Sequence, residues 1–139
     1  MGRYYTWTAA MNINKTYQST SVPAGMIQNP HRGICPEGWH IPTSSEWNTM
    51  NSKSGGYAAQ QAIGNPGWPN ATNASGFTAL PAGNCGGGFG DVGSNAYFWS
   101  ASEYYASYAG SWDMHAGRAS LNYTGFNKYD GYSVRCLQD

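Results

Sequence analysis

The residue types best suited to metal binding in this chain are histidine and cysteine near its first third. His31, Cys35 and His40 are close enough in sequence to be considered as ligands of one ion. A structural zinc site closes its tetrahedron with four ligands of this kind, and no fourth ligand is evident. We therefore expect a structural role for His40, and we assign no metal and no cofactor to the chain.

The three cysteines, Cys35, Cys85 and Cys136, fit neither a dense disulfide scaffold nor a four-ligand zinc site, and at most one pair of them can form a bridge. Cys85 lies in a Gly-rich stretch without a neighbouring His or basic residue to activate it as a nucleophile. Paired carboxylates and a Ser–His–Asp order are also missing. We expect no enzymatic activity.

Recognition through aromatic side chains is better supported by the composition. The 139 residues include 11 Tyr, 6 Trp and 19 Gly. Tyr, Ser, Gly and Asn dominate antibody-like binding surfaces, because a rigid ring offers contact area at a small loss of entropy. The same composition predicts a loop-rich fold with a core of aromatic rings and short strands.

Length and charge limit the classes of partner. Residues 1–139 fit a single domain. Charged residues make up 10% of the chain and the net charge is zero, so we expect neither nucleic acid nor an anionic membrane surface as partner. Apolar runs are too short to insert into a bilayer or to act as an export signal, and the abrupt start at Met1 leads us to expect further sequence upstream.

The clearest element predicted from the sequence is a helix that begins after Pro42. Thr43 and Glu46 have the spacing of a capping box, in which each side chain bonds the backbone N–H of the other residue. Trp47 and Met50 share one face of this helix, which we expect to end near Gly55.

Other segments are less regular. Residues 4–7 have the composition of a strand, residues 8–11 can form one helical turn, and residues 57–63 are predicted to form a second short helix. Residues 14–29 and 64–93 are rich in Gly, Pro and Asn and are predicted to be loops.

The last third is predicted to form a strand system, over residues 97–100, 112–115, 119–122 and 132–136. Trp112 and Met114 alternate with Ser111, Asp113 and His115. Side chains alternate between the two faces of a strand, so we expect the first pair to point inward and the other three outward.

Several motifs, in one order along the chain, resemble the Fibrobacter succinogenes major paralogous domain. They are Gly2-Arg3-Tyr4-Tyr5-Thr6-Trp7, Ile34-Cys35-Pro36-Glu37-Gly38-Trp39-His40-Ile41-Pro42, Asn73-Ala74-Ser75-Gly76-Phe77, Tyr97-Phe98-Trp99-Ser100 and Ser133-Val134-Arg135-Cys136. The resemblance implies an α+β, C-type-lectin-like fold related to the formylglycine-generating enzyme domain, with two short helices, a small twisted antiparallel sheet and long ordered loops. It also implies a disulfide between Cys35 and Cys136, which leaves Cys85 free.

Domains of this kind also resemble the variable proteins of diversity-generating retroelements, in which Asn-type codons of a C-terminal repeat are rewritten at adenines. Such rewriting cannot produce Trp, Met, Lys, Glu or Gln. Within residues 104–130 these types occur only as Trp112, Met114 and Lys128. The resemblance therefore implies a variable-type segment over about residues 97–136, with scaffold and variable positions interleaved.

We expect the exposed side chains of this segment to form the ligand-binding surface. Its predicted members are Tyr104, Tyr105, Ser107, Tyr108, Ser111, Asp113, His115, Arg118, Ser120, Asn122, Tyr123, Tyr129 and Asp130. The alternative is a solvated strand-and-loop face with incidental tyrosines. Many exposed rings in one segment favour a binding surface.

Calcium-dependent sugar binding, the best-known lectin activity, requires oxygen ligands that converge on the ion. It usually uses Glu-Pro-Asn or Gln-Pro-Asp in a loop and Trp-Asn-Asp on a strand, and neither motif is present. Trp68-Pro69-Asn70 lacks the acidic residue, and Trp112-Asp113-Met114 lacks the Asn. We expect no calcium site.

Three functions remain as hypotheses. The first is a receptor-recognition domain with a diversifiable face, displayed on a phage particle or a bacterial surface, that binds a protein or glycan and is able to form oligomers. The second is a structural or adhesive surface module with one fixed partner. The third is a degenerate enzyme of the formylglycine-generating type.

Overall fold

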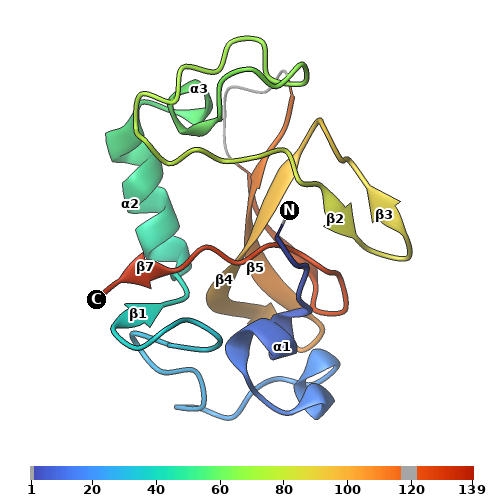
Figure 1. The fold of residues 1–139 in the computed structure, drawn as a ribbon. Coiled ribbons are helices and arrows are strands. Elements are labelled where there is room, and N and C mark those ends of the chain that lie inside the picture. The colour runs from blue at the N-terminus through green and yellow to red at the C-terminus, as the bar shows by residue number, and fades with distance from the viewer. Residues whose placement is uncertain (1, 117–121) are drawn as a thin grey trace.

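The computed structural model describes residues 2–116 and 122–139, which form an α+β fold of short helices and small antiparallel sheets (Figure 1). Long connections without regular structure join many of these elements. In chain order they are α1 (Trp7–Met11), the 3-10 helix η1 (Lys15–Gln18), β1 (Trp39–His40), α2 (Ser44–Ser54), α3 (Tyr57–Gln60), β2 (Asn84–Cys85), β3 (Phe89–Gly90), β4 (Ala96–Tyr105), β5 (Tyr108–Met114), β6 (Asn122–Asn127) and β7 (Leu137–Gln138).

Helix α2 begins and ends where its capping residues predict. The Thr43 hydroxyl accepts from the Glu46 amide at 3.3 Å, and the Glu46 carboxylate accepts from the Thr43 amide at 2.8 Å. Gly55 ends the helix with a φ of 82°, a conformation that disfavours residues with a side chain. Trp47 is buried and Met50 is half-buried, so the predicted apolar face is confirmed.

Two predicted elements near the N-terminus and after α2 are shorter than expected. In the first, only Tyr5 forms a bridge, with Tyr132, because the helical turn of α1 already begins at Trp7. In the second, α3 ends at Gln60 because the next residue is extended and pairs with Ala79. The loop over residues 14–29 also contains η1, which the sequence pattern did not predict.

The central sheet has the strand order β4-β5-β6 and is antiparallel. Its register places Phe98 opposite Trp112 and Trp99 opposite Ser111. The predicted strand over residues 119–122 lies outside the described residues except for Asn122, which is the first described residue of β6. Of residues 132–136, predicted as a strand, only Tyr132 and Ser133 form isolated bridges, and the terminal strand is β7.

One face of the sheet packs against α2. Trp47 lies parallel to Trp112, with ring centroids 5.6 Å apart and an interplanar angle of 7°, and it also contacts Phe98. Met114 belongs to the same cluster, and both Trp112 and Met114 have no exposed surface. Their predicted inward orientation is confirmed.

The opposite face is covered by Tyr132, which begins a segment that passes β4 on its way to β7 (Figure 1). Ser133 exchanges backbone hydrogen bonds with β4, donating to Tyr97 O at 3.1 Å and accepting from the Trp99 amide at 3.0 Å. The Tyr132 ring stacks on Trp99 with centroids 4.4 Å apart. Trp7 of α1 is buried in the same cluster. Both faces of the sheet are therefore covered, and β5 is its middle strand.

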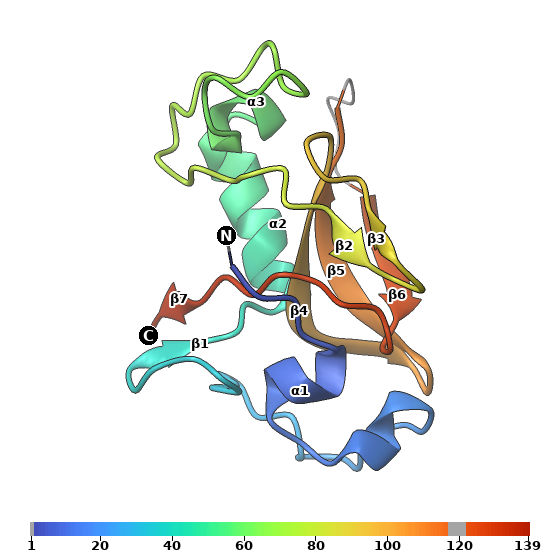
Figure 2. The same cartoon turned by 45° about the vertical axis from the view of Figure 1, so that its right-hand side comes forward.

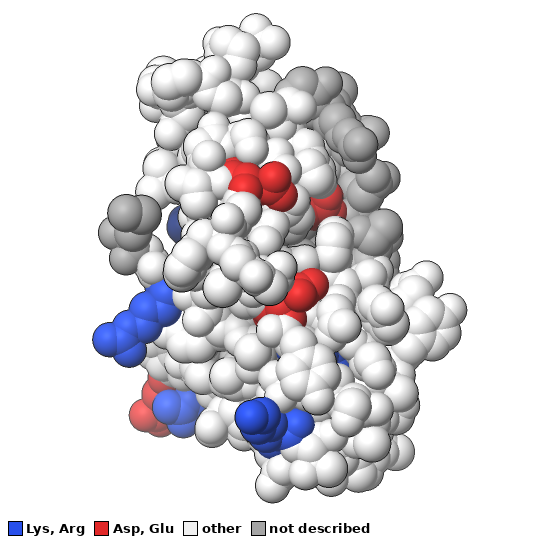
Figure 3. Space-filling model, turned by 90° about the vertical axis from the view of Figure 1, so that its right-hand side faces the viewer, with Lys and Arg blue, Asp and Glu red and all other residues white. Residues whose placement is uncertain are grey.

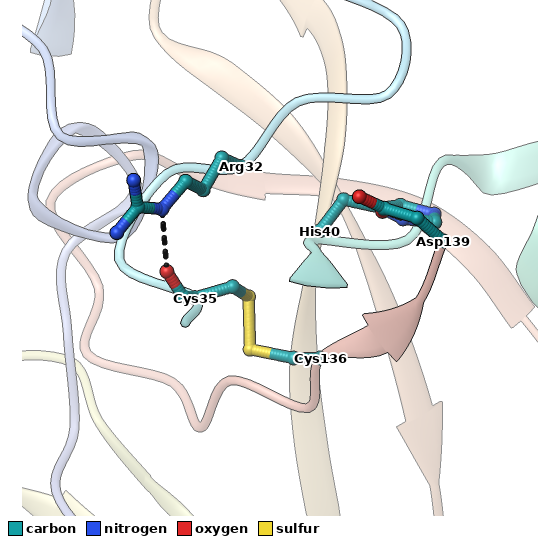
Figure 4. The surroundings of a disulfide bond; sticks show 5 residues. All are labelled: Arg32, Cys35, His40, Cys136 and Asp139. Atoms are coloured by element: carbon teal, nitrogen blue, oxygen red, sulfur yellow. Dashed lines mark hydrogen bonds and ion pairs between the residues drawn. A yellow bond between two sulfur atoms is a disulfide. The ribbon is translucent and has the colours of Figure 1, made fainter. Parts of the chain in front are cut away.

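This covering segment is tied down at its C-terminal end. Cys136 forms a disulfide with Cys35, with Cα atoms 5.9 Å apart, as the resemblance implied, and Cys85 is free. Next to the disulfide, the Asp139 carboxylate contacts Nδ1 of His40 at 2.6 Å, and Figure 4 shows these residues side by side. Nε2 of the same imidazole lies 3.0 Å from the Glu46 carboxylate.

Candidate ligand-binding surface

The hairpin that joins β4 to β5 carries three exposed tyrosines. The strands run to a two-residue turn at positions 106 and 107, where Tyr105 is paired with Tyr108. Tyr104, Tyr105 and Tyr108 are 49%, 65% and 43% exposed. A short turn at the end of paired strands holds these rings outward.

A fourth exposed tyrosine lies beside this turn. The Lys128 amide donates to the Ser107 carbonyl at 2.9 Å, which brings the residues after β6 to the hairpin. Tyr129 follows directly and is exposed, while Ser107 is half-buried in the turn. We call the four exposed residues the tyrosine tip: Tyr104, Tyr105, Tyr108 and Tyr129.

Tyr104 of β4 reaches past β5 and rests on a glycine of β6, the edge strand. Its ring meets that of Tyr105 edge to face at 4.7 Å, and a Cβ atom added at Gly125 would lie 2.7 Å from Tyr104 Cδ1. Gly125 therefore leaves room for the ring to lie close to the sheet. Position 125 cannot carry a side chain unless Tyr104 moves.

Beneath the tip lies a buried ammonium group. Lys128 has no exposed surface, and its Nζ donates to the carbonyl oxygens of Tyr17 at 3.0 Å, Thr20 at 3.2 Å and Ala106 at 2.8 Å. It also forms an ion pair with Glu103 of β4. The charge is thus surrounded by oxygen atoms, as a buried charge must be.

The same ion pair links the tip to the N-terminal region. The Glu103 carboxylate accepts from the Val22 amide at 3.1 Å, and Lys128 Nζ lies 4.7 Å from the centroid of the Trp7 ring. Figure 2 shows the β4–β5 turn beside η1. The tip is therefore joined to the core and to the loop after η1, which favours one fixed orientation.

Sequence reasoning missed this anchor, although it contained a signal. Lys128 was singled out with Trp112 and Met114 as a type that adenine rewriting cannot produce, and all three are fully buried. The alternation pattern identified only the two apolar residues. A buried lysine has no apolar periodicity to identify it, and Glu103 lies 25 positions away in sequence.

The prediction that Ser111 and Asp113 are exposed is wrong. Their exposed fractions are 0% and 1%. Alternation correctly placed them on the face opposite Trp112, but the segment around Tyr132 covers that face. They cannot contact a ligand directly in this conformation, so we remove both from the candidate surface.

His115 lies at the far end of β5 from the tip and is half-buried. Its Nε2 contacts the Asp113 carboxylate, and the Tyr97 ring packs edge to face against its imidazole at 5.7 Å. The Tyr97 hydroxyl donates to the Asp91 carboxylate at 2.7 Å. Burial and then this contact raise the pKa of Tyr97 to about 12, so the phenol stays protonated near neutral pH.

Asp130 is half-buried and faces a different hairpin from the tip. Its carboxylate is 3.5 Å from the Tyr132 hydroxyl, and a Cβ atom at Gly86, between β2 and β3, would approach one of its oxygens to 2.8 Å. Burial raises the pKa of Asp130. This carboxylate therefore lies against the β2–β3 turn.

The other predicted members cannot be placed on the surface. Arg118 and Ser120 lie outside the described residues. Asn122 and Tyr123 have a described backbone in β6, opposite Asp113 and Trp112, but no described side chains. Of the predicted set, the structure brings together the four residues of the tyrosine tip, with Ser107 in their turn.

Two other properties of the described residues bear on function. Over residues 2–116 and 122–139, no group of three or more His, Cys, Asp and Glu side chains is arranged to hold a metal ion. No helix in those ranges is long and apolar enough to cross a membrane. What the tip itself offers is aromatic area with phenolic hydroxyl groups.

Comparison with known proteins agrees with the motifs. The fold and the tip describe a small α+β domain that presents a fixed aromatic surface. The chain belongs to the Fibrobacter succinogenes major domain family, whose model matches residues 1–138. No curated protein and no solved structure matches the chain.

Proposed function

We propose that this domain binds a protein or glycan on a cell surface through the tyrosine tip. The observation that carries the proposal is a set of four exposed rings on a hairpin that a buried ion pair anchors. Aromatic rings dominate the energetics of many interfaces, and a contact surface fixed before binding loses less entropy on association. The phenolic hydroxyl groups add hydrogen bonds at little loss of rotamer freedom.

We further propose a C-type-lectin-like fold and a diversifiable C-terminal face, as in a variable protein of a diversity-generating retroelement. The burial of Trp112, Met114 and Lys128 supports this proposal, because the residues that adenine rewriting cannot produce are those that hold the sheet. Exchange of the exposed residues between them would leave this framework in place.

One observation favours the alternative, a structural or adhesive module with one fixed partner. Ser111 and Asp113 are buried, and Gly125 is constrained by the Tyr104 ring. Fewer positions in the segment are therefore free to vary than its composition indicated. A face with few variable positions suits a fixed ligand better than a changing one.

Charge and redox state support an external location and an uncharged mode of recognition. A disulfide such as Cys35–Cys136 persists in oxidising surroundings, such as a phage particle or bacterial surface. On the side of β2 and β3, acidic side chains lie near the middle of a mostly uncharged surface, and Lys and Arg gather toward one edge (Figure 3). Such a surface suits shape recognition better than phosphate binding.

A binding experiment tests the proposed surface. The variant Tyr105→Ser/Tyr108→Ser/Tyr129→Ser removes three rings of the tip, and Phe89→Ser removes an even more exposed ring, that of β3, as a control. Each is titrated against arrays of glycans and bacterial surface proteins that the unaltered chain binds. We expect at least about a hundredfold weaker binding for the tip variant and unchanged binding for the control. Retained affinity in the tip variant would contradict the proposal.

The DNA beside the coding sequence separates the two forms of the proposal. A near-copy of the segment for residues 97–136, differing only at adenines and lying beside a reverse transcriptase gene, would establish diversification. Its absence would favour the module with a fixed partner. A turnover assay with cysteine-containing peptides, in which we expect no product, tests the third hypothesis.

A further inference from the structure

A groove separate from the tyrosine tip lies between α2, the β1–β7 pair and the segment around Phe77. Its volume is about 260 Å³. Trp39, Trp47, Met50 and Leu137 line it together with Phe77, and all but Trp47 retain some exposed surface. The lining is thus mainly apolar and partly aromatic, as in small-molecule sites.

The polar groups of the groove differ in how far they are already satisfied. The Glu46 carboxylate accepts from the Thr43 amide and hydroxyl and contacts His40, so both of its oxygens are engaged. The hydrogen bonds and charges of Glu46 and Asp139 outweigh the effect of burial and raise the pKa of His40, which favours the imidazolium that balances these carboxylates.

Arg135 carries the remaining charge of the groove. It is exposed, its guanidinium lies 4.7 Å from the Phe77 ring, and one of its nitrogens donates to the Phe77 carbonyl at 2.9 Å. Among residues 2–116 and 122–139, no carboxylate forms an ion pair with it. A guanidinium has five N–H donors in a fork that matches a carboxylate, so most of them remain for a ligand.

We propose that this groove binds a small carboxylic acid with an apolar body. The body lies against Trp47, Phe77 and Leu137, and the carboxylate pairs with Arg135. The volume of the groove lies below the range of about 300 to 1,000 Å³ that is typical of ligand pockets. It therefore suits a small ligand of about ten non-hydrogen atoms. A sugar is a poorer fit, because its many hydroxyl groups would meet apolar side chains and a carboxylate whose oxygens are already engaged.

The test is a titration with phenylacetate, with phenylacetamide as the uncharged ligand of the same shape. Backbone and indole NMR signals are followed in the intact chain, in Arg135→Gln and in Arg3→Gln, which removes the same charge at an exposed position outside the groove. We expect saturable shifts at the lining residues, with affinity about tenfold lower for the amide and for Arg135→Gln, because the charge-assisted hydrogen bonds are lost. Arg3→Gln should bind like the unaltered chain.

A second variant keeps the proposal testable if Arg135→Gln is unstable. Met50→Trp fills the groove from α2 and leaves the guanidinium in place, and it should abolish the shifts while the rest of the spectrum stays native. The proposal is overturned if phenylacetate produces no saturable shifts in the intact chain. Equal binding of acid and amide, or equal binding by the two arginine variants, overturns it as well.

Discussion

The two ends of strand β5 differ in which residue types they expose. At the β4–β5 turn, Tyr105 and Tyr108 point into solvent above a buried ion pair. Farther along the same strand, Ser111 and Asp113 are buried although their residue types are more polar. Polarity alone would predict that the tyrosines are buried and that Ser111 and Asp113 are exposed.

The difference comes from what covers each end of the sheet. Near its middle, Trp47 of α2 packs on one face and Tyr132 on the other. At the turn, the segment that runs back from β6 places Lys128 below the hairpin rather than over it. A variable surface is therefore possible only where no other segment of the chain covers the sheet.

The largest expected effect lies at the middle of the sheet. Trp112→Ala should lower the free energy of unfolding by about 3 to 5 kcal/mol, because it removes a fully buried ring stacked on Trp47 and leaves a cavity. Met114→Ala should cost about 2 to 5 kcal/mol for the same reason. Denaturant unfolding monitored by circular dichroism measures both, and changes below about 1 kcal/mol would contradict the burial of these side chains.

Release of the covering segment is the next test. Cys35→Ser/Cys136→Ser opens a bridge between residues 101 positions apart. Loss of a cross-link that closes so long a loop should lower the free energy of unfolding by about 4 kcal/mol in the chain-entropy model. Hydrogen exchange should also increase at Ser133, whose amide bonds β4. Unchanged exchange there would mean that the segment is held without the disulfide.

At the tip, the anchor itself can be removed. Lys128→Met keeps much of the side-chain length but leaves Glu103, which is mostly buried, without its cation. We expect a loss of about 3 kcal/mol in unfolding free energy, and the double variant Lys128→Met/Glu103→Gln should recover part of it. Binding by the tip should weaken even where the variant is folded, because the rings lose their fixed orientation.

The control for this effect is Lys53→Met, which removes a charge from the exposed part of α2. It should change stability by no more than about 0.5 kcal/mol. If Lys128→Met were as mild as this control, the ion pair would not be the anchor of the tip.

The sequence predicted the elements whose signals are local. The capping box of Thr43 and Glu46 determines the start of α2, and alternation correctly placed Trp112 and Met114 inward. The Cys35–Cys136 pair came from the family resemblance rather than from the spacing of the cysteines.

The features that sequence reasoning missed depend on contacts between distant segments. Alternation assigns residues to two faces but does not say whether a second segment covers the outer one, as Tyr132 covers the face of Ser111. The Glu103–Lys128 pair likewise joins β4 to the turn after β6 and to η1. Four of the thirteen predicted site residues therefore meet in the tyrosine tip, whereas Ser111 and Asp113 belong to the interior.

A pH titration tests the second attachment of the covering segment, which is the contact between His40 and Asp139. Burial lowers the pKa of His40, but hydrogen bonds with Asp139 and Glu46 and their charges outweigh it and raise the pKa above the usual 6.5. The contribution to stability is thus full below about pH 6.5 and is lost as pH rises through the higher folded-state value. Thermal midpoints between about pH 5.5 and 8.5 should fall less steeply in His40→Gln than in the unaltered chain. Equal slopes of the thermal midpoint against pH in the two chains would show that His40 does not hold the covering segment in this way.

The smallest expected change in stability belongs to the tyrosine tip, and it decides whether the two ends of β5 really differ. Tyr105→Ser and Tyr108→Asp alter exposed rings, so each should shift the free energy of unfolding by no more than about 0.5 kcal/mol. The opposite exchange, Ser111→Tyr, inserts a ring into a fully covered site and should lower the free energy of unfolding by about 1 to 3 kcal/mol.

Tyr104→Ser serves as an internal probe, because it removes the ring above Gly125 and should make Gly125→Ala tolerable. Gly125→Ala alone forces Tyr104 to move. Thermal unfolding of the single variants and of the Tyr104→Ser/Gly125→Ala pair measures all of these effects. If the tip exchanges destabilise the chain as much as Ser111→Tyr does, the tyrosines serve the fold, and the proposal of a face that changes without disturbing it must be abandoned.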